Sequence, residues 1–131
     1  MEEIFYQNIL IGLWGKALDA GTWPLTAGTE ALQVLSLKHP RGTTIAAHYH
    51  VPTHRVTEDL QKCVVVLKGV IELRLYGQDR YFFRSLSLHS GEFFVLLRGA
   101  WEVAVIEDAE FLEFKNGPFK DDRVNFSGST V

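Results

Sequence analysis

Hydrophobic and polar residues alternate with a period of two along much of the chain. The clearest case is residues 71–76, where isoleucine and leucine side chains alternate with two charged residues and a tyrosine, as expected of a strand with one buried face. Residues 93–97 are apolar throughout, which is typical of a strand buried on both faces. We predict further strands over residues 4–14 (one or two strands), 32–37, 43–50, 61–68, 81–88, 101–106 and 111–115. No stretch has a helical period, so the pattern predicts an all-β sandwich or barrel.

Turn-forming residues separate the predicted strands. Residues 12–28 are punctuated by glycines and a proline, and residues 77–80 are a predicted hairpin turn. Residues 107–110, three of which are acidic, predict another turn, and residues 51–60 predict a polar loop. Residues 120–131 are polar and small, and we expect them to form a loosely held tail.

Composition adds the size and class of the protein to this picture. A chain of 131 residues with 47% hydrophobic and 12% aromatic content is expected to bury the core of one domain, residues 1–131. The net charge of −3 gives no reason to expect a nucleic acid or a membrane as partner. The start of the chain lacks the features of a signal peptide, and no run reaches transmembrane length, so we expect a cytoplasmic protein. The single cysteine, Cys63, excludes an intrachain disulfide and is predicted to be a buried thiol.

Two histidines, His48 and His50, are the strongest chemical signal. On a strand over residues 43–50 their side chains project from the same face, with Cα atoms about 6.5 Å apart. Bonds of about 2 Å between metal and nitrogen let two such imidazoles share one divalent ion. In the alternative interpretation, the two histidines on one strand face are ordinary hydrogen-bonded residues of the core.

The glycines around these histidines resemble the motifs of the cupin family. Gly42, His48, His50 and Gly69 have the spacing of the first cupin motif, and residues 91–99, from Gly91 to Gly99, resemble the second. The end of the chain, residues 113–119, is similar to the tail of a group of small single-domain cupins.

The resemblance covers about residues 32–119 and implies a cupin-type jelly-roll β-barrel of two antiparallel sheets. It also implies that N-terminal strands within residues 1–31 pack against a second subunit, giving a homodimer. The strand pattern leads independently to an all-β fold.

The family's metal set consists of two histidines and a glutamate from the first motif and a histidine from the second. His48 and His50 occupy the first two positions. The glutamate position, counted back from Gly69, falls on Lys62, and a protonated lysine cannot bind a metal. The neighbouring Gln61 offers an amide oxygen, and strand parity groups it with Cys63, Val65 and Leu67, an uncharged set that favours the interior. A local bulge would reverse the two faces, so the choice between Gln61 and Lys62 stays open.

The histidine position of the second motif is also substituted. Counting from Gly91 and Gly99 places Glu102 there, whereas counting back from Glu107 places Trp101 there. If Glu102 points inward, it completes a set of two histidines and one carboxylate, which suits iron(II) or another first-row divalent ion. If Trp101 points inward, only two ligands remain, and Trp101 either packs in the core or stacks on a ligand. Glu102 is then an exposed strand carboxylate.

The loop over residues 51–60 carries two further candidate substrate-binding residues, His54 and Arg55. It is longer than the corresponding segment of the common cupin pattern. In a barrel it is either a lid over the mouth or a solvated insertion. Arg55 has a planar guanidinium that binds a carboxylate or a phosphate in the lid case.

Three functions are compatible with these residues. The first is a protein that binds a divalent metal (Fe, Ni, Zn or Mn) in the barrel and acts on a small polar or sugar-like metabolite. The second is a metal-free isomerase or epimerase of nucleotide-linked sugars, with His48 and His50 as acid and base. The third is a non-catalytic module that binds a small ligand. The fold alone does not decide among them.

Overall fold

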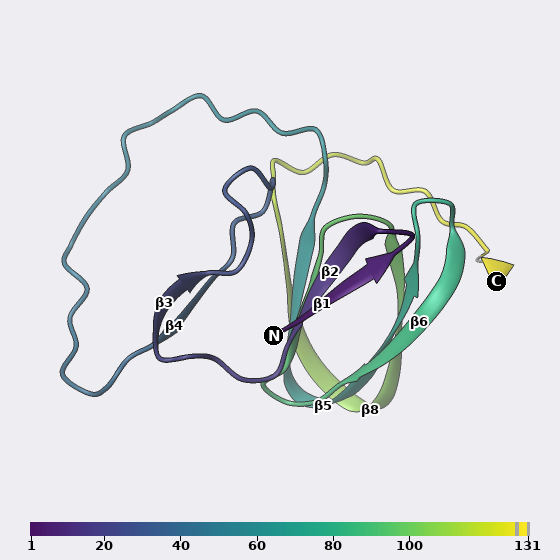
Figure 1. The fold of residues 1–131 in the computed structure, drawn as a ribbon, viewed down its shortest axis with the longest axis horizontal. Helices are drawn as coiled ribbons and strands as arrows, with labels where there is room; N and C mark the ends of the chain where they lie inside the picture. The colour runs from purple at the N-terminus through teal and green to yellow at the C-terminus, as the bar shows by residue number, and fades with distance from the viewer. Residues whose placement is uncertain (128, 131) are drawn as a thin grey trace.

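The computed structural model of the protein describes residues 1–127 and 129–130. They form a strongly curled sheet, shaped as a half-barrel, with a small second sheet beside it (Figure 1). The described residues contain no helix, so the predicted all-β class is confirmed. The strands are β1 (Glu2–Tyr6), β2 (Ile9–Gly15), β3 (Gly21–Pro24), β4 (Leu35–Lys38), β5 (Lys62–Tyr76), β6 (Tyr81–Leu88), β7 (Phe93–Leu96), β8 (Ala100–Lys115) and β9 (Ser129–Thr130).

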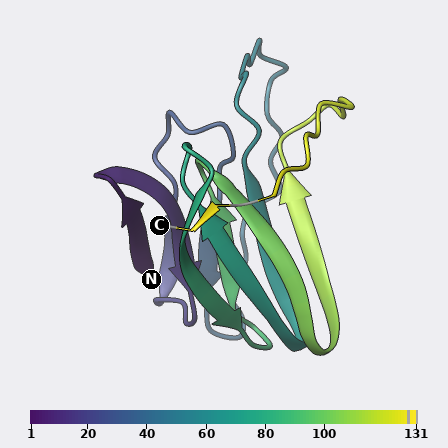
Figure 2. The same ribbon diagram turned by 90° about the vertical axis from the view of Figure 1, so that its right-hand side faces the viewer.

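Strand β5 is the centre of the main sheet. Its residue Val65 pairs with Phe93 of β7 on one edge and with Leu112 of β8 on the other edge. Beyond β7 lie β2 and β1, and the second half of β5 pairs with β6, which carries β9. Figure 2 shows β5 and β8 running side by side along their length. Among the described strands, β3 and β4 pair only with each other and form the second sheet.

Several predicted elements are confirmed. In two places, two strands that are predicted to be separate form one continuous strand. The strand 81–88 and the turn after residue 76 agree with the structure. The predicted strands 61–68 and 71–76 are continuous in β5, and those over 101–106 and 111–115 are continuous in β8. The turn predicted at residues 107–110 is therefore wrong.

Strands β5 and β8 continue without a turn because they share a bulged region. The register between β5 and β8 shifts between Val66 and Ile71, so the strands bend together without separating. Gly69 lies in this bulge with φ of 79°, and a Cβ atom there would lie 2.1 Å from the carbonyl oxygen of Asp108. Only glycine permits this close approach of the two backbones.

The histidine strand predicted over residues 43–50 is not formed. The described segment between β4 and β5 contains no strand, and residues 39–60 are exposed. In Figure 1 this segment, which we call the 39–60 loop, arcs away from the sheet. A strand needs a neighbouring strand to pair its backbone groups, and here none lies alongside. The strand predicted over 32–37 is likewise confined to β4, which pairs with β3 in a region predicted as turns.

The core lies mainly on the inner face of the curled sheet. Its buried members come from β1, β2, β5, β6 and β7: Ile4, Ile11, Val64, Val66, Ile71, Leu73, Leu75, Leu86, Leu88, Phe94 and Leu96. A smaller cluster covers the outer face beneath the second sheet: Leu13, Cys63, Phe93, Val95 and Leu97. Burial of the Cys63 thiol is thereby confirmed.

The N-terminal strands, which the cupin resemblance assigns to a dimer interface, are part of this core. Ile4 of β1 and Ile11 of β2 are buried within the same chain. Tyr6 stacks on Phe83 of β6, with ring centroids 4.7 Å apart, and its hydroxyl donates a hydrogen bond to Asp79. Strand β1 thus packs against β6 across the half-barrel. The homodimer stays a prediction.

Two further predictions concern the ends of the chain and the membrane. Of the predicted tail, residues 120–127 are exposed, while residues 128 and 131 lie outside the described part. Among the described residues, no helix is long and apolar enough to cross a membrane.

Candidate functional site

Strand alternation places Lys62, and not Gln61, on the inner face of the sheet. Lys62 shares its side of β5 with the core residues Val64 and Val66. Its ammonium nitrogen lies 5.1 Å from the centroid of the Trp101 ring, within reach of a cation–π attraction. Trp101 in turn contacts Phe94 in the core, with ring centroids 6.2 Å apart.

A carboxylate from β8 completes this arrangement. The Nζ atom of Lys62 lies 3.6 Å from Oε1 of Glu113, and the two side chains are 27% and 36% exposed. Both charges are therefore reachable from solvent, although the aliphatic stem of Lys62 lies against apolar side chains. A half-buried pair of opposite charges presents both a donor and an acceptor to a ligand.

An apolar surface adjoins this ion pair. Val103, Val105 and Phe111 of β8 pair with Leu73, Ile71 and Val66 of β5, so they lie on the same inner face. All three β8 side chains are exposed. We call this surface the Trp101 face; its members are Lys62, Trp101, Val103, Val105, Phe111 and Glu113.

The Gln61 side chain is held by hydrogen bonds to other parts of the fold. Its side chain is buried, and its Oε1 atom accepts a hydrogen bond from the backbone N–H of Leu32 at 2.8 Å. Its amide group donates to Glu30, and its backbone N–H donates to the side chain of Asn116. The side-chain oxygen proposed as a metal ligand is thus already engaged.

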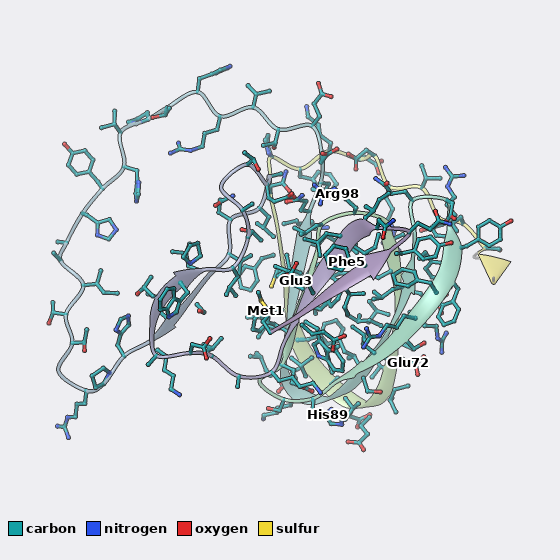
Figure 3. The ribbon with its side chains drawn as sticks, viewed as in Figure 1. Met1, Glu3, Phe5, Glu72, His89 and Arg98 are labelled. Atoms are coloured by element: carbon teal, nitrogen blue, oxygen red, sulfur yellow. The ribbon has the colours of Figure 1, made fainter. Side chains whose placement is uncertain are left out.

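Glu102 lies on the outer face of the sheet, opposite Trp101. Its carboxylate accepts a hydrogen bond from Arg74, whose Nε atom also donates to Glu72 at 2.7 Å. The hydrogen bonds to Glu72 and Glu102 raise the pKa of the Arg74 guanidinium above its ordinary value. Figure 3 shows the position of Glu72 on the sheet, far from the 39–60 loop.

The histidines lie in that loop, away from the Trp101 face. The rings of His48 and His50 are neighbours, with centroids 5.5 Å apart, and Nδ1 of His48 lies 2.7 Å from the carbonyl oxygen of Ala46. His54 and Arg55 are exposed in the same loop. The structure brings His48 and His50 together but joins neither Gln61 nor Glu102 to them.

This donor set does not fit a catalytic metal centre. Such centres use three or more protein ligands, and among the described residues no group of three histidine, cysteine, aspartate or glutamate side chains is arranged to hold a metal ion. We therefore derive no chemical step through a metal at this position.

Comparison with known proteins gives no assignment. The chain matches no protein-family model, no curated protein sequence and no solved structure. The cupin resemblance therefore stays a prediction based on the glycines and histidines of the sequence.

Two residues of the Trp101 face, Lys62 and Glu113, are not predicted from the sequence as members of a site. The cupin resemblance gives Lys62 only the position of a glutamate ligand, which a lysine cannot fill. Strand alternation places Glu113 and Lys115 on one face of the predicted strand 111–115, as members of a cross-strand pair. The pairing of Lys62 with Glu113 depends on the register between β5 and β8, in which Lys62 lies opposite Lys115 and Val64 opposite Glu113. Strand parity does not decide the face, because it groups Lys62 with the apolar Val64 and Val66 and groups Gln61 with the apolar Cys63, Val65 and Leu67.

Proposed function

We propose that this protein is a cupin-type binding protein that holds a small polar, sugar-like metabolite on its Trp101 face. The observation that carries the proposal is the grouping of Lys62, Glu113 and Trp101 at 3.6 Å and 5.1 Å on the inner face of a half-barrel. Sites for small molecules typically combine apolar and aromatic walls with a few polar groups that fix orientation.

Each side chain has a chemical role in this proposal. The face of the Trp101 indole packs against the C–H groups of a sugar ring. The Lys62 ammonium donates hydrogen bonds to ligand hydroxyl or carboxylate oxygens, and Glu113 accepts them from hydroxyl groups. Because each charge already has the other as partner, neither is left uncompensated when the ligand leaves.

The backbone supports the cupin assignment and, with it, the proposed jelly roll. The four glycines on which the resemblance rests all have positive φ, between 79° and 93°: Gly42, Gly69, Gly91 and Gly99. Residues with a Cβ atom rarely adopt this conformation, so the backbone needs glycine at these positions.

Replacing Trp101 with alanine tests the proposed binding face. We expect ligand-observed NMR to find binding among monosaccharides, nucleotide-linked sugars and hydroxy acids. Trp101→Ala should raise the Kd of the selected ligand about tenfold, the equivalent of about 1.4 kcal/mol. Lys62→Met should weaken the same ligand because it removes the donor and retains the apolar stem.

The matched control is Trp23→Ala, since Trp23 is an exposed tryptophan on the second sheet. Its Kd should equal that of the wild type. Equal losses in Trp23→Ala and Trp101→Ala, or no binding from any of the three classes, would refute the proposal.

The pair His48 and His50 supports a second candidate, weak binding of a divalent metal in the 39–60 loop. With two imidazoles and no third donor beside them in the described part of the chain, we expect purified protein to carry well under one equivalent of Fe, Ni, Zn or Mn. Added Zn²⁺ should bind weakly and be lost in a His48→Ala, His50→Ala double variant. Elemental analysis checks this expectation directly. A full equivalent of metal, absent from the double variant, would instead favour a metal-dependent cupin.

A further inference from the structure

An apolar cavity lies on the other side of β5 from the Trp101 face. It occupies about 170 Å³ between the second sheet and the outer face of the main sheet, and it is open to solvent on the side lined by Leu18, Leu35 and Leu37. Cys63 and Val65 of β5 line it, whereas their neighbours Lys62 and Val64 point to the inner face. The cavity is thus separate from the proposed polar site, although one strand contributes to both.

The walls of this cavity are held by hydrogen bonds. The backbone N–H of Leu25 donates to the carbonyl of Val34 at 2.8 Å, and the N–H of Val34 donates to the Thr26 hydroxyl at 3.1 Å. These hydrogen bonds fix the segment that connects β3 to β4. This segment places Leu25 and Val34 over Phe93.

The lining is almost entirely apolar. Its inner part consists of Leu25, Val34, Cys63, Val65 and Phe93, and the exposed side chains of Leu18, Leu35 and Leu37 contribute its outer part. The Ser36 hydroxyl and the Cys63 thiol are the only polar side-chain groups among the lining residues. Burial raises the pKa of the Cys63 thiol to about 11, so it is protonated and uncharged at neutral pH.

Volume and chemistry together define the class of ligand. An enclosed cavity of about 150 Å³ lined by aliphatic and aromatic residues binds benzene, which shows that a volume of this size accommodates one aromatic ring. A volume of about 170 Å³ takes up one six-membered ring, and the apolar lining favours such a ring over a phosphate or a hydroxyl-rich group. The thiol adds a favourable sulfur contact to the edge of an aromatic ring. We propose that this cavity is a binding site for a single aromatic ring of a small apolar molecule.

The test uses toluene as the probe and Cys63 as the reporter. Methyl methanethiosulfonate reacts with the small thiolate fraction of the single cysteine of the intact protein at alkaline pH, and mass spectrometry follows the rate. At ten times its Kd, toluene should slow this modification about tenfold, because it lowers the free fraction of sites by a factor of 1 + [L]/Kd. No slowing at saturating toluene would overturn the proposal.

Two variants test the location of the site. Val65→Phe fills the cavity and should abolish the toluene-induced rise in Tm. Val103→Phe is the same substitution on the exposed inner face of β8, and it should retain this rise. A rise that persists in Val65→Phe would overturn the assignment. If Val65→Phe does not fold, NMR of the wild type decides: toluene should shift the methyl groups of Leu25 and Val34 and leave Val103 unchanged.

This result is independent of the polar site. Trp101→Ala should bind toluene as the wild type does, and the sugar-like ligand should not protect Cys63. Failure of one site therefore leaves the test of the other intact.

Discussion

Replacing Phe94 with alanine is expected to lower the free energy of unfolding by about 3–5 kcal/mol. Phe94 is the largest fully buried side chain, with 0% of its surface exposed. It is paired with Trp14 of β2 and with Val64 of β5, so its ring joins three strands of the inner core. The loss combines the transfer of the ring to water with the cavity that it leaves.

The surroundings of Phe94 make collapse of that cavity difficult. Its ring covers Gly12, where an added Cβ atom would lie 2.4 Å from the ring. Gly12 has no side chain to move into the vacated space, which places the effect toward the upper end of the range. Urea denaturation followed by circular dichroism measures it.

Phe5→Ala is the matched control, since Phe5 is exposed on β1 (Figure 3). It should change stability by less than about 1 kcal/mol. A loss of that small size in Phe94→Ala would show that the inner core is not built around this ring.

The second large effect is expected for Glu30→Gln, which should cost about 2–3 kcal/mol at pH 7. The Glu30 carboxylate accepts hydrogen bonds from Arg98 at 2.7 Å and from the Gln61 amide, and it is only 12% exposed. A neutral glutamine cannot compensate the charge of Arg98. Because Gln61 also holds Leu32, this network ties the segment before β4 to the start of β5.

The pH dependence has a defined sign. Burial alone raises the pKa of Glu30, but the hydrogen bonds from Arg98 and Gln61 and the charge of Arg98 outweigh burial and lower it below its ordinary value of 4.5. A lowered pKa in the folded state gives stability that is fully present above about pH 4.5 and is lost as the pH falls through the folded value. The difference in stability between wild type and Glu30→Gln should therefore shrink below that pH.

Urea denaturation of both proteins between about pH 3 and pH 7 checks this expectation. Glu3→Gln removes an exposed carboxylate on β1 (Figure 3) and should show no such pH-dependent difference. A difference for Glu30→Gln that stays constant down to pH 3 would mean that the folded state does not lower the pKa of this carboxyl.

Much of the fold is determined locally by the sequence. The period of two over β6, the turn between β5 and β6 and the apolar run of β7 each depend on neighbouring residues, and each is present in the structure. The burial of Cys63 follows from the same apolar pattern. Alternation and turn chemistry act over a few residues, so a single sequence contains them in full.

The candidate site depended on information that no local pattern contains. A shift of one residue in register exchanges the two faces of a strand. The sequence therefore left open whether Trp101 or Glu102 points inward. Pairing of β8 with β5 places Trp101 on the inner face. The ion pair of Lys62 and Glu113 joins residues that are distant in sequence. The 39–60 loop has strand-like residues but no neighbour to pair with. Register, shared bulges and the presence of a neighbouring strand are properties of the folded chain, and only the tertiary structure decided them.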